Sequence, residues 1–154
     1  LALAMREPDT TLRKNRVLAL LSAVGLEGFA DSYPSQLSQG MRQRVALART
    51  FSLKSRFVLL DEPFGALDAM TKVTLQNLLT KLWTETAGTT VVLVTHDIAE
   101  SVALADRVIV MSARPGRIVS DVKVQLPRPR DVRQLRYSTE YHDLVGQIWE
   151  KLEG

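Results

Sequence analysis

A short apolar run, Phe57 to Leu60, ends abruptly in the acidic triplet Asp61-Glu62-Pro63. A run of this length with charged flanks is typical of a strand buried on both faces of a parallel sheet. A second, β-branched run from Thr90 to Val94 ends at Thr95-His96-Asp97, and residues 69–86 between the two runs have helical spacing. Strand, helix and strand in this order predict a βαβ unit, and therefore an α/β fold with a mostly parallel sheet.

The rest of the chain alternates in the same way. Apolar residues recur at helical spacing over residues 11–24, 39–53, 97–105 and 138–153. Residues 107–111 predict another strand, and the looser alternation of residues 118–126 after the Pro115-Gly116 turn predicts a hairpin strand added at the sheet edge. A chain of 154 residues with these elements is expected to form one compact domain.

Composition excludes several classes of protein. Hydrophobic residues make up 45% and charged residues 24%, which is ordinary for a globular chain, and no apolar run reaches the ~18 residues of a membrane-spanning helix. The absence of cysteine excludes disulfides, thiolate zinc sites and cysteine nucleophiles. The net charge is +3, but residues 57–112 hold three Lys/Arg against seven Asp/Glu. Without a basic stripe, we expect no nucleic-acid partner.

The polar residues at the strand ends are the first candidates for chemistry, because ligands of open α/β sheets bind beyond the carboxyl ends of the strands. Two adjacent acids, Asp61 and Glu62, close the first strand, and His96 and Asp97 follow the second. One carboxylate can hold a magnesium ion while the other, if buried, polarises a water molecule. This is an arrangement for nucleotide hydrolysis. The alternative is a solvated acidic turn that caps the next helix.

A second candidate lies in the segment LSQGMRQRVALART, which begins at Leu37. Ser38 and Gly40 stand where a helix is predicted to begin, and the free N–H groups and positive dipole at a helix start attract anions such as phosphate. The alternative is that Ser38 is simply the N-cap of the helix.

Three segments in order, LSQGMRQRVALART, FVLLDEPFGALDA from Phe57 and VVLVTHD from Val91, resemble the nucleotide-binding subunit of ATP-binding cassette (ABC) transporters. The resemblance covers residues 37–97. It implies the carboxyl-terminal part of a P-loop NTPase cassette, with a mostly parallel sheet and part of the helical subdomain. Residues 1–154 would then form one partial domain: a helical subdomain and signature helix (1–56), a core with Walker B, D-loop and switch histidine (57–126), and a helical tail (127–154).

The resemblance also implies roles for single residues. Ser38, Gln39 and Gly40 match the signature motif, which contacts the γ-phosphate of ATP bound by the opposite subunit. Asp61 matches the Walker B aspartate that holds Mg²⁺ through water, and Glu62 matches the catalytic glutamate. Four further positions match the D-loop, which crosses the dimer interface, and the switch histidine, which senses the γ-phosphate: Ala66, Leu67 and Asp68 for the loop, and His96 for the switch.

The chain departs from the family pattern in two ways. Gln39 stands at the first of two usual signature glycines, where a side chain would clash if the backbone needed a positive φ, and Met41 replaces the usual Gln. The phosphate-binding pattern G-x-x-x-x-G-K-[ST] is absent, since none of the six lysines follows a glycine, and no glutamine of a Q-loop precedes Gln36. We therefore expect a cassette without its Walker A and Q-loop, whose sheet exposes apolar edges and faces and which is inactive by itself.

The expected function of the intact subunit is ATP hydrolysis with Mg²⁺, driving import of a small anionic solute such as nitrate, sulfonate or taurine through a separate membrane-spanning permease. The partners implied are a second nucleotide-binding subunit and the permease, at the cytoplasmic face of the membrane. The tail segments SARPGRIV from Ser112, LPRPRD from Leu126 and YSTEYHDLVGQIWEKLE from Tyr137 resemble the nitrate, sulfonate, taurine and bicarbonate importers. The alternatives are a truncated, non-hydrolysing cassette that serves as an interaction module, and a non-transport ABC ATPase.

Overall fold

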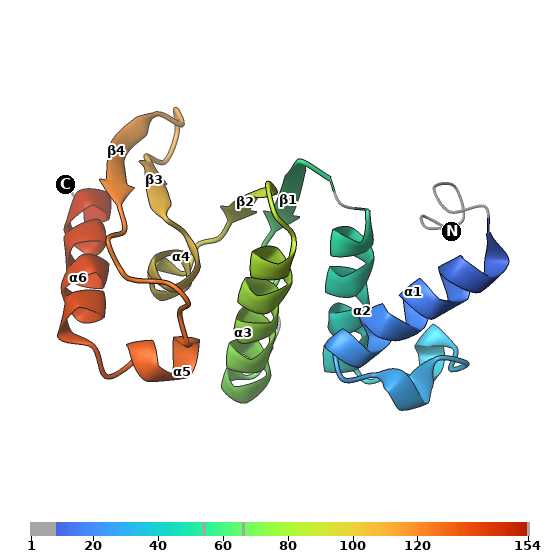
Figure 1. The fold of residues 1–154 in the computed structure, drawn as a ribbon. Coiled ribbons are helices and arrows are strands. Elements are labelled where there is room, and N and C mark those ends of the chain that lie inside the picture. Colours follow the sequence, from blue (N-terminus) through green and yellow to red (C-terminus); the bar gives the residue numbers. More distant parts are fainter. Residues whose placement is uncertain (1–8, 54, 66, 154) are drawn as a thin grey trace. The chain divides into compact units, whose positions relative to one another are not determined.

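The computed structural model describes residues 9–53, 55–65 and 67–153, drawn in colour in Figure 1. The chain forms two compact units. The first comprises Leu1–Val58 and Lys81–Val91, and the second comprises Leu59–Thr80 and Val92–Gly154.

The first unit is built on two helices, α1 (Thr10–Ala23) and α2 (Gln39–Ser52), with short 3-10 turns at Glu27–Phe29 and Pro34–Gln36 between them. Both helices were predicted within one residue at each end, and the segment between them was predicted as a turn, although not as two 3-10 turns. The Asp9 side chain caps α1 by accepting hydrogen bonds from the amides of the second and third residues of the helix.

Arginines from each of these helices satisfy the last carbonyls of the other helix. Arg44 of α2 donates to Val24 O, just past the end of α1, at 3.4 Å, and Arg16 of α1 donates to Ser52 O, at the end of α2, at 3.0 Å. A cation at a helix carboxyl end also complements the helix dipole. The pair is therefore held by polar bonds at the helix ends, which fits the absence of any buried residue within α1.

The second unit follows the predicted order of elements. Its strands and helices, some of which begin or end in the first unit, are β1 (Phe57–Asp61), α3 (Ala69–Glu85), β2 (Thr90–Val94), α4 (Ile98–Leu104), β3 (Arg107–Met111), β4 (Ile118–Lys123), α5 (Val132–Leu135) and α6 (Thr139–Glu153). Only the short α5 was not predicted. The α/β class is confirmed.

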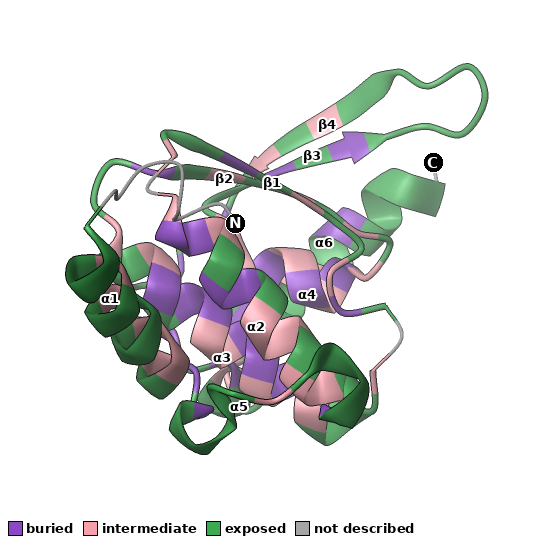
Figure 2. Cartoon of the chain, turned by 90° about the vertical axis from the view of Figure 1, so that its right-hand side faces the viewer, coloured by how far each residue is buried: buried purple, intermediate pink, exposed green. Residues whose placement is uncertain are grey.

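The strands are divided between two sheets of two strands each. The amide of Thr90 donates to Arg56 O at 2.8 Å and that of Glu62 donates to Val94 O at 2.9 Å, so β1 and β2 run parallel, as predicted. The predicted hairpin is present, since β3 and β4 pair antiparallel with a bulge near Met111, but it forms a sheet of its own, whereas the prediction placed it at the edge of the sheet that holds β1 and β2. Figure 2 shows that much of this hairpin is exposed.

The prediction that β1 is buried on both faces is wrong. Val58 is 4% exposed, but its neighbours Phe57 and Leu59 are 70% and 77% exposed. Because successive side chains of a strand point to opposite faces, one face of β1 is covered in this structure and the other is not.

One apolar cluster forms the core of the second unit. The members come from α3, α4, β3, α5, α6 and the segment after β4: Val73, Ile98, Val102, Ala103, Val108, Val110, Val124, Leu126, Val132, Tyr141 and Ile148. The Tyr141 hydroxyl donates to Ala99 O at 2.9 Å, which ties α6 to α4.

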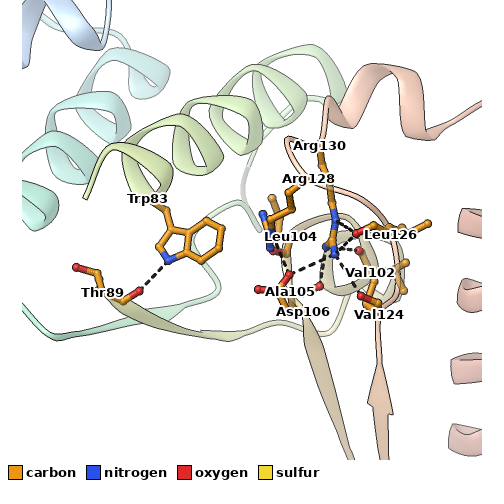
Figure 3. Close-up of polar contacts among 10 residues, drawn as sticks. All are labelled: Trp83, Thr89, Val102, Leu104, Ala105, Asp106, Val124, Leu126, Arg128 and Arg130. Carbon is orange, nitrogen blue, oxygen red and sulfur yellow. Dashed lines mark hydrogen bonds and ion pairs between the residues drawn. The ribbon is translucent and has the colours of Figure 1, made fainter. Parts of the chain in front are cut away.

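A buried guanidinium joins the end of α4 to the segment after β4 (Figure 3). Arg130 is 4% exposed and donates to Ala105 O at 2.7 Å and to Leu126 O at 3.0 Å, with longer bonds to Val102, Val124 and Asp106. Burial lowers the pKa of Arg130, and the charge of Arg128 lowers it further. Arg130 therefore supplies donors to several carbonyls that the secondary structure leaves without one.

We predict that Arg130→Met lowers the free energy of unfolding by about 2–4 kcal/mol, because it leaves buried carbonyls without donors. The exposed Arg133 provides a control of the same chemistry, and Arg133→Met is expected to change stability by less than about 0.5 kcal/mol. Urea denaturation of the variants measures both effects. Equal stabilities of the two variants would contradict the role given to Arg130.

Candidate functional site

The candidate site lies where the parallel strands β1 and β2 end. Glu62 follows β1 directly, and His96 lies two residues beyond the end of β2. Parallel strands place their carboxyl ends at the same edge of a sheet, and the bond from the Glu62 amide to Val94 O fixes the register there. As a result, His96 Nδ1 lies 2.7 Å from Glu62 Oε1. The structure therefore brings together the two residues predicted to be catalytic.

The backbone of Glu62 adopts an unusual conformation. Its φ is +45°, and Glu62 is the one residue other than glycine with a positive φ in the described part of the chain. Its carbonyl accepts a bond from Gly65 N at 3.3 Å, and a β-carbon at Gly65 would lie 3.4 Å from Glu62 Oε2. A left-handed conformation costs a non-glycine residue roughly 1–2 kcal/mol, and such strain is concentrated at functional sites.

The electrostatics of the pair follow from its geometry. The hydrogen bond that Glu62 accepts from the imidazole, and then the negative charge of Glu62, raise the pKa of His96 above its usual value. Asp97 adds to the rise, while burial and Lys72 oppose it. The side chains of His96 and Glu62 are 79% and 41% exposed. Solvent screens a pair this exposed, so the contact contributes little to stability.

Asp61, the predicted magnesium ligand, is the last residue of β1 and directly precedes Glu62. Both acids are exposed, which corrects the expectation of a buried carboxylate acting as the base. No group of three or more His, Cys, Asp or Glu side chains arranged to hold a metal is found among the residues described. A single carboxylate still fits Mg²⁺, because this ion keeps several waters and takes one or two protein carboxylates together with phosphate oxygens.

Asp68 begins the next helix. Its Oδ1 accepts bonds from the amides of Met70 at 3.1 Å and Thr71 at 3.0 Å, which makes it the cap of α3. A hydrogen bond from the Thr71 hydroxyl, and then the bond from its amide, lower the pKa of Asp68. Of the other predicted D-loop residues, Ala66 lies outside the described residues. The role of this loop at a dimer interface stays a prediction.

Sequence reasoning named Asp97 beside His96 but missed the ion cluster that Asp97 forms with Lys72 and Glu100. Lys72 Nζ lies 2.7 Å from Asp97 Oδ2 and 3.0 Å from Glu100 Oε2, and Gln76 donates to the same Glu100 oxygen at 3.2 Å. The available indication was spacing: Lys72 stands four residues after Asp68, and Asp97 and Glu100 stand at the cap and third positions of a helix.

The predicted signature residues belong to the first unit, whereas Glu62, Asp68 and His96 belong to the second. Ser38 has extended backbone angles, and its hydroxyl accepts a bond from Met41 N at 3.2 Å, so Ser38 caps α2. Gln39 and Gly40 form the first turn of that helix. Because Gln39 is helical and has no positive φ, the clash considered for its side chain does not arise.

The chain is similar to several known proteins. The sequence model of the ABC transporter family matches residues 3–65. An uncharacterized ABC transporter ATP-binding protein of Methanocaldococcus jannaschii is 54% identical over 83% of this chain and 47% of that protein. The aliphatic sulfonates import ATP-binding protein SsuB of Rhodopseudomonas palustris is 46% identical over 94% of this chain and 48% of its own length.

A solved structure also matches. It is the dimeric structure of a post-hydrolysis state of an ATP-binding cassette bound to ADP and Pi, with a TM-score of 0.61 and 37% identity over 77% of this chain and 50% of that chain. The chain thus spans about half the length of the relatives it matches.

Fold, motifs and matches define the class: this chain is part of an ATP-binding cassette with the fold of the P-loop NTPases. It belongs to the ABC transporter ATP-binding family, and sulfonate import proteins are among its relatives at 46 to 54% identity.

The strained backbone of Glu62 makes a prediction about stability. Glu62→Gly is expected to be more stable than Glu62→Ala by about 1 kcal/mol, because glycine adopts the left-handed conformation without strain. Neither variant keeps the contact with His96, so that loss cancels in the comparison. Glu150, which is exposed within α6, is the control. There glycine should be less stable than alanine by about 1 kcal/mol. Urea denaturation of the four variants measures this reversal, and the same order at both positions would contradict the positive φ.

The raised pKa of His96 makes a prediction about pH. The pair stabilises the fold below about pH 6.5, the usual pKa of histidine, and this contribution disappears as the pH rises through the higher pKa of the folded state. NMR titration of the imidazole carbons should show that Glu62→Gln lowers the pKa of His96. The other histidine, His142, faces Arg136 O at 2.9 Å and serves as an internal control that the substitution leaves unchanged. An unaltered His96 titration in the variant would rule out the contact.

Proposed function

We propose that the complete subunit containing this chain hydrolyses ATP and thereby powers import of a small anionic solute through a separate membrane permease. The observation that carries the proposal is the contact between Glu62 and His96 beside Asp61, at the ends of two parallel strands, in a chain of the ABC transporter family.

Phosphoryl transfer requires little covalent work from a protein, so catalysis would consist of positioning and charge stabilisation. In our proposal the Glu62 carboxylate orients the attacking water and accepts its proton. His96 uses Nδ1 toward Glu62, which leaves Nε2, on the other side of the exposed ring, to contact the γ-phosphate. Asp61 would hold Mg²⁺ through water, and the ion would supply charge neutralisation to the phosphates.

The remaining candidate residues would act between two subunits. Ser38, Gln39 and Gly40 would contact the γ-phosphate held by the opposite subunit through the amino-terminal end of α2, and Asp68 would lie near the interface. Support comes from the cap geometry of Ser38, which leaves the first turn of a 14-residue helix for an anion, and from the dimeric state of the matching ATP-binding cassette.

The solute class rests on relatives. Several are named as aliphatic sulfonates import ATP-binding proteins, and sulfonate, nitrate and taurine share a compact anionic oxygen group that a binding protein and permease would select. We place the subunit at the cytoplasmic face of the membrane, bound to its permease and without a nucleic-acid partner. In the described part of the chain no helix is long and apolar enough to cross a bilayer.

We also propose that the 154-residue chain by itself is a non-hydrolysing part of the cassette, because it has no G-x-x-x-x-G-K-[ST] pattern to cradle the phosphates. It would still offer its signature helix to a partner subunit. A non-transport ABC ATPase has no observation in its favour here.

Glu62→Gln in the complete subunit is expected to reduce ATP turnover by roughly 100-fold or more, because it removes the base, while ATP-dependent dimerisation persists. Phosphate release and analytical ultracentrifugation with ATP and Mg²⁺ measure the two properties. Glu150→Gln, an exposed change on α6, is the matched control and should retain full turnover.

Two results would contradict the proposal. One is unchanged phosphate release by the Glu62→Gln subunit, which would remove Glu62 from the catalytic step. The other is hydrolysis by the 154-residue chain alone under the same conditions, which would show that the missing pattern is not required.

A further inference from the structure

Lys72 connects α3 and α4, the helices that follow β1 and β2 in the chain, after Glu62 and His96 respectively. It lies in the first turn of α3, where its amide donates to Asp68 O at 2.9 Å. Its Nζ reaches across to the start of α4 and contacts both Asp97, at 2.7 Å, and Glu100, at 3.0 Å. The side chain of Glu100 is only 2% exposed, and that of Lys72 is 23% exposed. An ion pair with this burial is screened less than one at the surface.

Asp97 uses each of its carboxylate oxygens for a different bond. Oδ1 accepts a bond from Glu100 N at 3.0 Å and caps α4, while Oδ2 accepts a bond from Lys72. The Asp97 amide donates to Thr95 Oγ1 at 3.1 Å. Burial raises the pKa of Asp97, but the bonds from Lys72 and from Glu100 N outweigh it and leave the pKa below its usual value. Asp97 is thus a charged, fully engaged anchor next to His96 in the chain.

The contact between His96 and Glu62 needs such an anchor. Both side chains are substantially exposed, and exposed pairs contribute little energy of their own. Their geometry therefore depends on what fixes the two backbones. Glu62 is fixed by its bonds to Val94 and Gly65. Among the residues that the structure describes, none forms a comparable backbone bond with His96, and the fixed residue next to it in the chain is Asp97.

We infer that Lys72 is a positioning residue: by holding Asp97 it keeps the His96 imidazole against the Glu62 carboxylate. Chain and contacts together form a closed loop. The chain leads from Glu62 to Asp68 and into α3, Lys72 of α3 binds Asp97, and His96, next to Asp97 in the chain, contacts Glu62. Lys72 also ties the D-loop end of α3 to the switch histidine. The catalytic consequence of this arrangement rests on the proposed function, whereas the arrangement itself does not.

The competing explanation is that Lys72 only neutralises the buried Glu100. Glu100→Gln separates the two roles, because it removes that carboxylate charge and keeps the Asp97 contact with Lys72. Glutamine retains an oxygen for the bond from Gln76. Lys72→Met is made in the Glu100→Gln variant, because loss of Lys72 alone would leave the buried Glu100 carboxylate without its cation and destabilise the protein.

The experiment is an NMR titration of His96 in the full 154-residue chain, comparing Glu100→Gln, the double variant Lys72→Met/Glu100→Gln, and Lys72→Arg. The direction of the change is diagnostic. The positive charge of Lys72 lowers the pKa of His96, so its removal alone would raise that pKa, whereas loss of the Glu62 contact lowers it. We expect the double variant to lower the pKa of His96, in the same direction as Glu62→Gln. Glu100→Gln and Lys72→Arg should leave it near its original value.

An unchanged or raised His96 pKa in the double variant would overturn the inference, as would an equal fall in Glu100→Gln alone. In the complete subunit, the double variant should lose roughly 10- to 100-fold in kcat relative to Glu100→Gln, with KM for ATP little changed, because misplacement of a catalytic group affects the chemical step. The NMR result does not depend on hydrolysis. Failure of the proposed function would appear as unchanged ATP turnover in Glu62→Gln. Failure of this inference would appear as a His96 pKa that does not fall in Lys72→Met/Glu100→Gln.

Discussion

The hydrogen bond from the Glu62 amide to Val94 O sets the geometry on which the candidate site depends. It is the last rung of the parallel β1–β2 pair, and it decides which residue of one strand end faces which residue of the other. A slip of one residue would turn the side chains of one strand to the other face. The 2.7 Å contact between His96 and Glu62 is therefore a consequence of strand register, reinforced by the left-handed turn at Glu62 and the cap at Asp97.

Much of the fold was readable from the sequence, because hydrophobic period and cap residues are local properties. The helices α2 and α3 and the strands β1, β2 and β3 begin and end within a residue of their predicted limits. The exposure of Phe57 and Leu59 was not readable, since an apolar run predicts what a strand favours and not what covers it. The division of the strands into two sheets depends in the same way on tertiary pairing.

The places of the candidate residues at the strand ends were predictable, and the contacts that support them were not. Glu62 and His96 were found from their places at strand ends, and the structure joins them. The positive φ of Glu62, the Lys72 pair with Asp97 and the carbonyl bonds of Arg130 depend on contacts between residues far apart in the chain. No periodicity or short motif encodes such contacts. Lys72 and Arg130 look in the sequence like ordinary exposed cations, yet Arg130 is almost completely buried.

The exposure of the His96–Glu62 pair has a functional meaning under the proposed mechanism. A buried pair would resist separation, because breaking it leaves an uncompensated charge in a medium of low dielectric. An exposed pair is weak, and its members exchange partners with water or a phosphate at small cost. A histidine that must respond to the presence of a γ-phosphate needs this property. It also needs a backbone that stays in place while the side chain changes partners, which the less exposed ion pair of Lys72 with Asp97 and Glu100 provides. The ion pairs of Lys72 are thus the less exposed and stronger interactions, and the His96–Glu62 contact is the exposed and weaker one.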